Sequence, residues 1–240
     1  MADGGHPHLL VGETDDRELA KAAARDRFRA EALAAIPPRY SPWAHFAVPS
    51  VFGVVVTVVA LALLRDVRLL ELALVPVFFV AFNGIEWVAH RDFLHVRRRG
   101  AEVLYDRHTP VHHRIFVEDD MALRDVREFG MVLIPAYGIV LIASVVAPLS
   151  FGLAWAGQRN VACLFAATAM AYAVSYEWLH LAYHAPSSSF VGRLGFVARL
   201  RRHHARHHRP SLMQTTNFNV SLPLFDWLLG TSHRDDGPRT

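Results

Sequence analysis

The chain has 240 residues, of which 52% are hydrophobic and 20% charged, and its formal net charge is +3. This balance is typical of a membrane protein rather than of a soluble domain of similar length. Its single cysteine, Cys163, excludes internal disulfides and also a cysteine-ligated zinc or iron–sulfur site.

The first forty residues differ from the rest of the chain. Residues 1–15 are rich in glycine, aspartate and histidine, which predicts disorder. Residues 15–36 are predicted to form a helix that Pro37 and Pro38 end. Its weakly apolar face would suit the headgroup layer of a membrane. We therefore expect residues 1–40 to be a partly disordered cytoplasmic segment with one amphipathic helix, and residues 41–240 to form a membrane-embedded domain.

Four long apolar segments follow. A helix of about twenty apolar residues crosses the hydrocarbon core of a bilayer, and these segments are close to that length. A soluble protein with buried helices is the alternative, but soluble helices rarely run nineteen residues without a charge, as residues 46–64 do. Pro135 and Pro148 are expected to kink the third segment and to end it. The predicted transmembrane helices are residues 46–64, 69–90, 129–151 and 161–176.

Arginines mark the side of the membrane on which the connections lie. Residues 91–127 hold eight arginines and residues 193–209 hold six, whereas the links 65–68 and 152–160 are almost neutral. The positive-inside rule then places both termini and the central loop in the cytoplasm, in our view at a bacterial inner membrane. The short links favour antiparallel neighbours. We predict an all-α integral membrane fold of four transmembrane helices in two antiparallel hairpins, with a helical, histidine-rich cytoplasmic cap.

Ten of the fifteen histidines fall into four compact clusters, each beside the end of an apolar segment. Neutral imidazole is a common metal ligand, and spacings of three or four place two rings on one helical face. Ten ligands exceed what one ion accepts, so the clusters indicate a dinuclear site. Residues 90 and 95 would point about 140° apart on an ideal helix, so the chain must bend or unwind near Arg91–Leu94. The clusters are His90 and His95; His108, His112 and His113; His180 and His184; and His204, His207 and His208.

Two glutamates precede histidines at helical spacing. Glu86 lies four residues before His90, and Glu177 lies three before His180. Because a ligating imidazole usually donates its other N–H to a carboxylate or carbonyl, both are candidate hydrogen-bond partners of ligand rings. His203 adjoins the last cluster and is either such a partner or a competitor, since it lies four residues before His207.

The ligand type leaves the metal open, because imidazole suits zinc, copper, iron and nickel. At the rim of a membrane bundle, two irons would activate O2 against an unactivated C–H bond of a lipid. A membrane metal transporter or storage protein is an alternative of another class, although transporters usually carry ionisable residues in mid-membrane. The run RLRRHHARHHR also permits a nucleic-acid patch, but it directly follows a membrane segment, so we expect no nucleic acid.

The sets HRDFLH, HTPVHH, HLAYH and HARHH, followed by NFNVSLPLFDWLLGT, resemble the fatty acid hydroxylase/sterol desaturase superfamily of integral-membrane non-haem di-iron enzymes. The resemblance covers about residues 45–232. It implies that the ten clustered histidines bind two irons, with zinc possible in isolated protein, and that no catalytic residue stands apart from this centre. Asn217, in the tail motif, is expected to support the ligands. The resemblance further implies O2 as co-substrate and electrons from NAD(P)H through a redox protein.

Members of this superfamily hydroxylate or desaturate acyl chains, sphingolipids, sterols or carotenoids. We expect O2-dependent hydroxylation of an acyl chain or acyl-bearing lipid, with desaturation and sterol or carotenoid hydroxylation as alternatives. The chain lacks an attached cytochrome b5 domain, so a separate ferredoxin or cytochrome b5-like donor is expected. Asn219 stands where related tails often have glycine, which predicts a different local turn. The substrate cavity is expected near Phe78, Phe79, Tyr172 and Tyr176, without an assigned substrate-binding residue.

Overall fold

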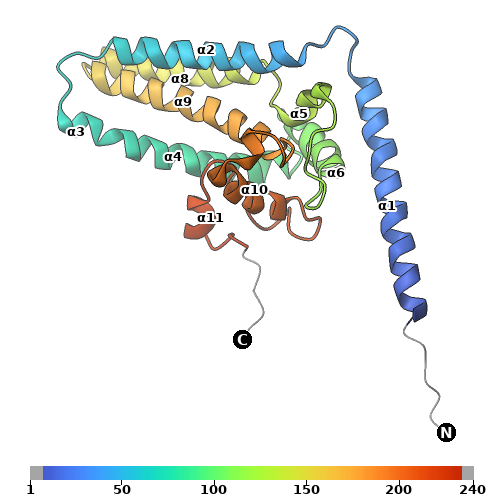
Figure 1. Ribbon diagram of the computed structural model, residues 1–240. Helices are drawn as coiled ribbons and strands as arrows, with labels where there is room; N and C mark the ends of the chain where they lie inside the picture. The colour runs from blue at the N-terminus through green and yellow to red at the C-terminus, as the bar shows by residue number, and fades with distance from the viewer. Residues whose placement is uncertain (1–7, 234–240) are drawn as a thin grey trace. The chain divides into compact units, whose positions relative to one another are not determined.

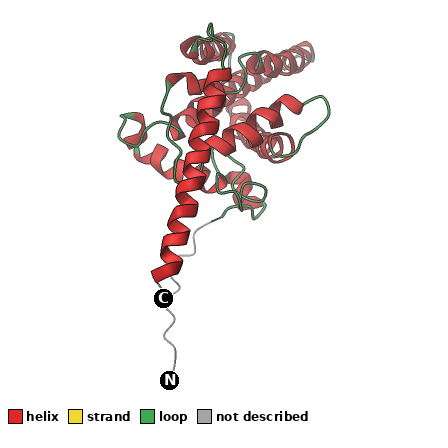
Figure 2. Ribbon diagram, turned by 90° about the vertical axis from the view of Figure 1, so that its right-hand side faces the viewer, coloured by secondary structure: helices red, strands yellow, loops and turns green. Residues whose placement is uncertain are grey.

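The structure, a computed structural model, describes residues 8–233. Those residues form helices, turns and loops and contain no β-strand (Figure 2), which confirms the all-α prediction. By its contacts the chain divides into two compact units, Met1–Tyr40 and Ser41–Thr240. Each unit is described by itself.

The first unit contains one long helix, α1 (His8–Ala35). It begins seven residues before the predicted start, so the expectation of disorder over residues 8–14 is wrong. These residues contain no proline and a single glycine, and nothing in them interrupts a helix. The same expectation for residues 1–7 lies outside the described residues. Leu19, one of the apolar residues of this helix, is exposed.

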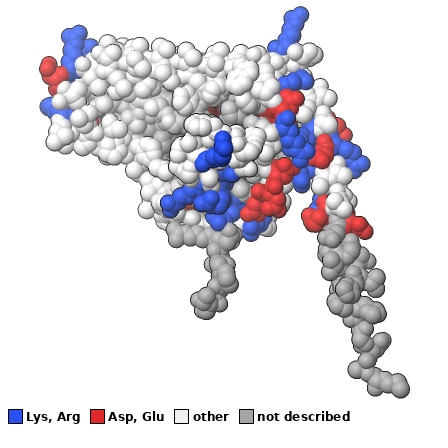
Figure 3. Space-filling view, viewed as in Figure 1, with Lys and Arg blue, Asp and Glu red and all other residues white. Residues whose placement is uncertain are grey.

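Four helices of the second unit are long and apolar enough to cross a membrane, which indicates a membrane protein. Their surface carries exposed valines and leucines, and a space-filling view shows a broad uncharged band with charged side chains gathered at its ends (Figure 3). Such a surface is unfavourable in water and favourable in lipid. The four spans are Pro42–Ala62, Leu69–Leu94, Gly138–Trp155 and Arg159–Tyr183.

The last of these helices, α9 (Arg159–Tyr183), is the centre of the bundle. It packs against α2 (Pro42–Ala62), α8 (Gly138–Trp155) and α4 (Leu74–Ala89), as Figure 1 shows. Gly53 permits close approach of α2, because a Cβ there would lie 2.3 Å from the Val174 side chain. Helix α9 is accordingly the most buried of the four spans.

The third apolar segment differs from the prediction. The structure has a short helix α7 (Phe129–Val132), a break, and then α8, which begins at Gly138. Pro135 lies in the break, where its missing N–H and the restriction it places on the preceding residue disfavour a helix. Pro148 lies inside α8 and does not end it. The interruption expected at Pro135 is therefore a full break rather than a kink, and the end expected at Pro148 is wrong, because α8 continues to Trp155.

Except for α3 (Leu69–Leu72), which lies at the opposite end, the remaining elements gather at one end of the bundle (Figure 1). The short helix α3 precedes α4, and α4 continues as a π-helix over His90–Leu94. After the last span, a 3₁₀ turn over Val191–Arg193 and an extended Leu194 precede the helix that begins at Gly195. The other elements at this end are α5 (Glu102–Arg107), a π-helix over His108–His112, α6 (His113–Ile115), a 3₁₀ turn Val126–Glu128, α10 (Gly195–His207) and α11 (Leu224–Leu228).

Candidate metal centre

Two of the histidine clusters lie on π-helical turns. A π-helix closes hydrogen bonds between residues five apart, so such residues come to the same side. The His95 amide donates to the His90 carbonyl over 3.2 Å, and the two rings stack with centroids 5.1 Å apart. This confirms the expected unwinding near Arg91–Leu94. In the second cluster the same geometry joins His108 with His113, whose Nε2 atoms are 3.0 Å apart.

The ten clustered histidines form two groups of five, all buried. Within each group, one nitrogen of every ring lies within 4.8 Å of all the others. The first group contains both π-helical pairs and one histidine of α10. Its members are His90, His95, His108, His113 and His207.

The second group uses pairs four residues apart on ordinary α-helices. His180 and His184 come from the end of α9, while His204 and His208 come from α10, with their Nε2 atoms 3.0 Å apart. His112 completes the second group. Its spacing of four from His108 would place both rings on one face of an α-helix, but here the two rings belong to different groups. The members are His112, His180, His184, His204 and His208.

Two of the three double histidines in the sequence supply one ring to each group, whereas the pair at residues 203–204 supplies only His204. Consecutive residues on a helix point about 100° apart, so His112 and His113 diverge, as do His207 and His208. The rings of His113 and His208 stack across the two groups with centroids 4.2 Å apart. The two groups are therefore immediate neighbours.

Backbone carbonyls fix the orientation of five rings. The Nδ1–H of His112 donates to the Met131 carbonyl over 3.0 Å, and that of His184 donates to the Met121 carbonyl over 2.8 Å. With Nδ1 protonated and donating, Nε2 keeps its lone pair. The other three contacts of this kind are His90 to Phe218, His207 to Thr216 and His208 to Phe116.

Burial keeps these rings neutral. Loss of hydration lowers the pKa of His108, His112 and His113 well below the usual value of imidazole, and the neighbouring imidazoles lower it further. Burial also lowers the pKa of His208 to about 3. Neutral imidazole is the form that binds a metal ion.

The residues fit a pair of metal ions. The donor set is all imidazole, and Nε2 of His112 and of His180 is buried without a hydrogen-bond partner among the described residues. An unpaired buried nitrogen is costly unless something binds it. Two nitrogens held about 2.1 Å from one ion lie roughly 3 Å apart at a right angle. The Nε2 atoms of His90 and His108 are 2.9 Å apart, as are those of His95 and His207.

The two glutamates do not bond the histidine rings. The Glu86 carboxylate accepts hydrogen bonds from the Val220 and Ser221 amides and from the hydroxyls of Tyr172 and Ser221. It therefore holds the tail segment whose Phe218 carbonyl orients His90. Glu177 accepts from the Ile134 amide over 3.2 Å and so holds the break before α8.

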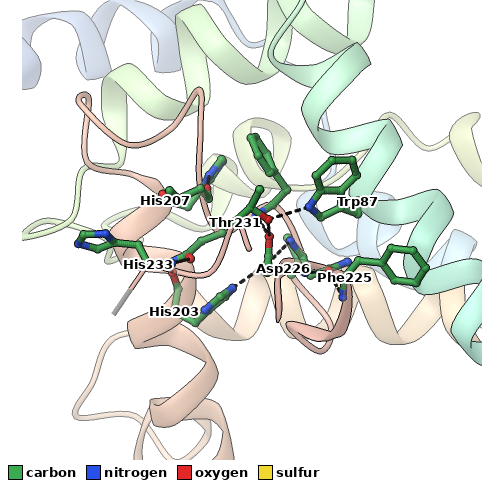
Figure 4. Close-up of polar contacts among 12 residues, drawn as sticks. Trp87, His203, His207, Phe225, Asp226, Thr231 and His233 are labelled. Atoms are coloured by element: carbon green, nitrogen blue, oxygen red, sulfur yellow. Dashed lines mark hydrogen bonds and ion pairs between the residues drawn. The ribbon is translucent and has the colours of Figure 1, made fainter. Parts of the chain in front are cut away.

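Asp226, which the sequence analysis did not single out, organises the tail (Figure 4). Its buried carboxylate accepts from the Phe218 and Asn219 amides, each over 2.9 Å, from the Thr231 hydroxyl over 2.7 Å, and from His203 over 3.0 Å. His203 therefore lies outside both groups and supports this carboxylate. The motif NFNVSLPLFDW could have indicated this role. Its aspartate follows an asparagine-rich turn by seven residues, and a carboxylate at that position can accept hydrogen bonds from the amides of the turn.

The two asparagines of the motif have different roles. Asn217 adopts a left-handed conformation with φ of 57°, and its amide group donates to the His203 carbonyl. It therefore supports the tail rather than a ligand ring. Asn219 has no positive φ, and its side chain donates to the Asn83 carbonyl over 3.0 Å and accepts from the Phe225 amide. The left-handed turn thus lies two residues before the position where glycine is common in related tails.

A cavity of about 510 Å³ connects the membrane bundle with the histidines. Its walls are mostly apolar and come from α2, α4, α5, α8, α9 and the break before α8. Members of both groups line it, as do Tyr172 and Tyr176, whereas Phe78 and Phe79 do not. The histidines that line it are His45, His90, His108, His112 and His180.

Comparison with protein-family models matches residues 75–231 to the fatty acid hydroxylase family, a match that includes all ten histidines of the two groups. Comparisons with curated proteins and with solved structures gave no significant match. The matched region covers more than half of the chain, and the four apolar helices of the chain and its paired histidine groups agree with a membrane oxidoreductase. The chain belongs to the fatty acid hydroxylase family.

Proposed function

We propose that this protein hydroxylates a C–H bond of a lipid acyl chain with O2, using two irons held by the two groups of five histidines. The neutral, carbonyl-oriented rings and the unpaired nitrogens support this assignment. Bound iron would supply the activation of O2 that no side chain provides. The chain's own contribution is to hold ten rings rigidly, keep them deprotonated and exclude water.

The observation that carries the proposal is the cavity. It is a mostly apolar space of a size that suits a small lipid or an acyl chain, and it ends at rings of both histidine groups. Ile85 of α4 and Leu141 and Val145 of α8 line it and are also exposed on the outer surface of the bundle. We infer that an acyl chain enters from the bilayer between α4 and α8.

The proposed topology places the cap in the cytoplasm. The arginine-rich segments 91–127 and 193–209 belong to the end of the bundle that carries the histidines, and the positive-inside rule assigns such segments to the cytoplasm. We further propose two antiparallel hairpins, α2 with α4 and α8 with α9, cytoplasmic termini, residues 1–40 as a separate cytoplasmic segment, and a bacterial inner membrane as the location.

Electrons are proposed to come from NAD(P)H through a separate ferredoxin or cytochrome b5-like protein. Exposed arginines of the cap, such as Arg199 and Arg202 of α10, suit an acidic partner. Complementary charge mainly speeds association and sets orientation, so high salt should slow electron delivery to the enzyme.

The test is to compare the lipids of cells with and without the gene by mass spectrometry and to measure the metal content of the purified protein. A new hydroxylated acyl chain together with about two irons per chain supports the proposal. A new double bond without hydroxylation would identify a desaturase. Unchanged lipids with zinc transport into vesicles would identify a transporter instead.

A further inference from the structure

One cation lies in the wall of the mostly apolar cavity. Among the described residues that line it, Arg107 is the one arginine or lysine. It ends α5, the helix that also contributes Val103 and Leu104 to the cavity wall, and it directly precedes His108. Its side chain is exposed, so it stands where the cavity meets the surroundings.

Arg107 has no carboxylate partner among the described residues, unlike Arg91 and Arg97. Arg91 pairs with Asp92 at 2.8 Å and Arg97 with Asp106 at 2.8 Å. The guanidinium of Arg107 instead donates to the Gly130 carbonyl, in the chain segment that forms one wall of the cavity. Because a guanidinium has five N–H donors, most of them remain for a ligand.

The carboxylates of the cavity are already occupied. Glu86 holds the tail through four donors, and Glu177 accepts from the Ile134 amide. Neither is placed to neutralise Arg107 by an ion pair. An unpaired cation beside an apolar space matches one ligand shape, an apolar chain that carries an anionic head.

We propose that Arg107 binds the anionic headgroup of the substrate, so the enzyme selects acyl chains that end in an oxyanion, either a carboxylate or a phosphate. The planar guanidinium suits both, because it binds two oxygens at once. The apolar walls then hold the chain, while Arg107 fixes the depth to which it enters. This inference rests on the proposed function, since it assumes that the cavity takes an acyl substrate.

The test measures direct binding of defined lipids to the purified full-length protein in detergent. Palmitate is compared with palmityl alcohol, which has the same chain and no charge, and with dipalmitoyl phosphatidate. Palmitate, phosphatidate or both should bind about tenfold more tightly than the alcohol, the effect expected of a charge-assisted hydrogen bond at an exposed site. If the preference over the alcohol that depends on Arg107 is larger for palmitate, the headgroup is a carboxylate. If it is larger for phosphatidate, the headgroup is a phosphate.

Variants assign the preference to this side chain. Arg107→Gln should remove the preference and leave alcohol binding unchanged, while Arg107→Lys should keep part of it, because lysine retains the charge without the planar fork. Arg99→Gln, at an exposed arginine outside the cavity wall, should behave as wild type. Thermal unfolding of each variant reports any loss of the contact with Gly130.

Equal binding of alcohol and both anions to the wild type, or a preference that survives in Arg107→Gln, would overturn the inference. Hydroxylation of acyl chains without any dependence on Arg107 would also overturn it and would leave the proposed function standing. A preference that depends on Arg107 in a protein that hydroxylates nothing would instead overturn the proposed function and keep the anion site.

Discussion

The ring of His113 stacks on the ring of His208, with centroids 4.2 Å apart and planes inclined by 22°, although the two residues belong to different five-histidine groups. The neighbouring residues in the chain, His112 and His207, lie in the opposite groups. These two double histidines therefore join the two groups through adjacent backbone positions. The distance between the two proposed metal ions is therefore set by the backbone of α10 and of the π-helix over His108–His112.

The first prediction concerns the independence of the groups. His180→Ala removes one ligand of the second group, so bound iron should fall from about two to about one per chain, and hydroxylation should fall by at least about a hundredfold. Metal analysis and product formation check this. His233→Ala, outside both groups, should retain both ions. Two ions bound in His180→Ala would contradict the assignment.

The second prediction concerns the partner of His95. The Thr109 hydroxyl donates to the Leu94 carbonyl over 2.7 Å and lies 3.2 Å from Nδ1 of His95, so its oxygen can accept from that ring. Thr109→Val should weaken metal binding in the first group by about tenfold, because loss of an orienting partner typically costs ~10–100-fold in affinity. Competition with a chelator measures this.

The matched control for Thr109 is Thr168→Val. The Thr168 hydroxyl donates to the Leu164 carbonyl within α9, remote from any ring nitrogen of the two groups. It should leave chelator competition unchanged. If both variants lost metal equally, the contact between Thr109 and His95 would have no special role.

The third prediction concerns the tail. Asp226→Ala leaves the buried amides of Phe218 and Asn219 without their acceptor and should destabilise the protein by about 3 kcal/mol. Because the Phe218 carbonyl orients His90, the first group should also lose metal. Thermal unfolding and metal analysis report both effects.

An exposed carboxylate provides the comparison for Asp226. Asp106 pairs with Arg97 on the surface, and Asp106→Asn should change stability by less than about 0.5 kcal/mol. If Asp226→Ala had the same stability and metal content as Asp106→Asn, other contacts would hold the tail.

The fourth prediction uses two alanines of α9. Ala173 lines the cavity and Ala171 is exposed away from it. Ala173→Phe should narrow the cavity, so hydroxylation should shift towards shorter chains or fall by about tenfold, with both metal ions retained. Ala171→Phe should have no such effect. Chain-length profiles of the products distinguish the two variants, and identical profiles would show that the cavity does not hold the substrate.

Sequence predicted the parts of this structure that follow from residue type. Runs of apolar residues gave the four spans, and the five-residue spacing of His90 and His95 required the unwinding that the π-helix provides. The division into groups was not predictable, because it depends on which i, i+4 or i, i+5 pairs the local helix type selects. Residues 108–113 allow both, and the π-turn decides.

The partners of the rings could not be predicted for a different reason. Every residue has a carbonyl, so no residue type marks those of Met131 or Met121 as acceptors for His112 and His184. Both belong to non-helical segments or helix ends, where carbonyls lack a helical donor. Glutamates near the histidines favoured a carboxylate partner, yet Glu86 acts one step away, through the tail.

The most direct test of the central claim is exposure of the purified, iron-loaded protein to labelled O2 with an electron donor and an acyl lipid, followed by mass spectrometry of the product. We expect one labelled oxygen atom in a hydroxylated acyl chain, and at least about a hundredfold less product from His180→Ala. An unlabelled hydroxyl group, or equal product from His180→Ala, would contradict that claim.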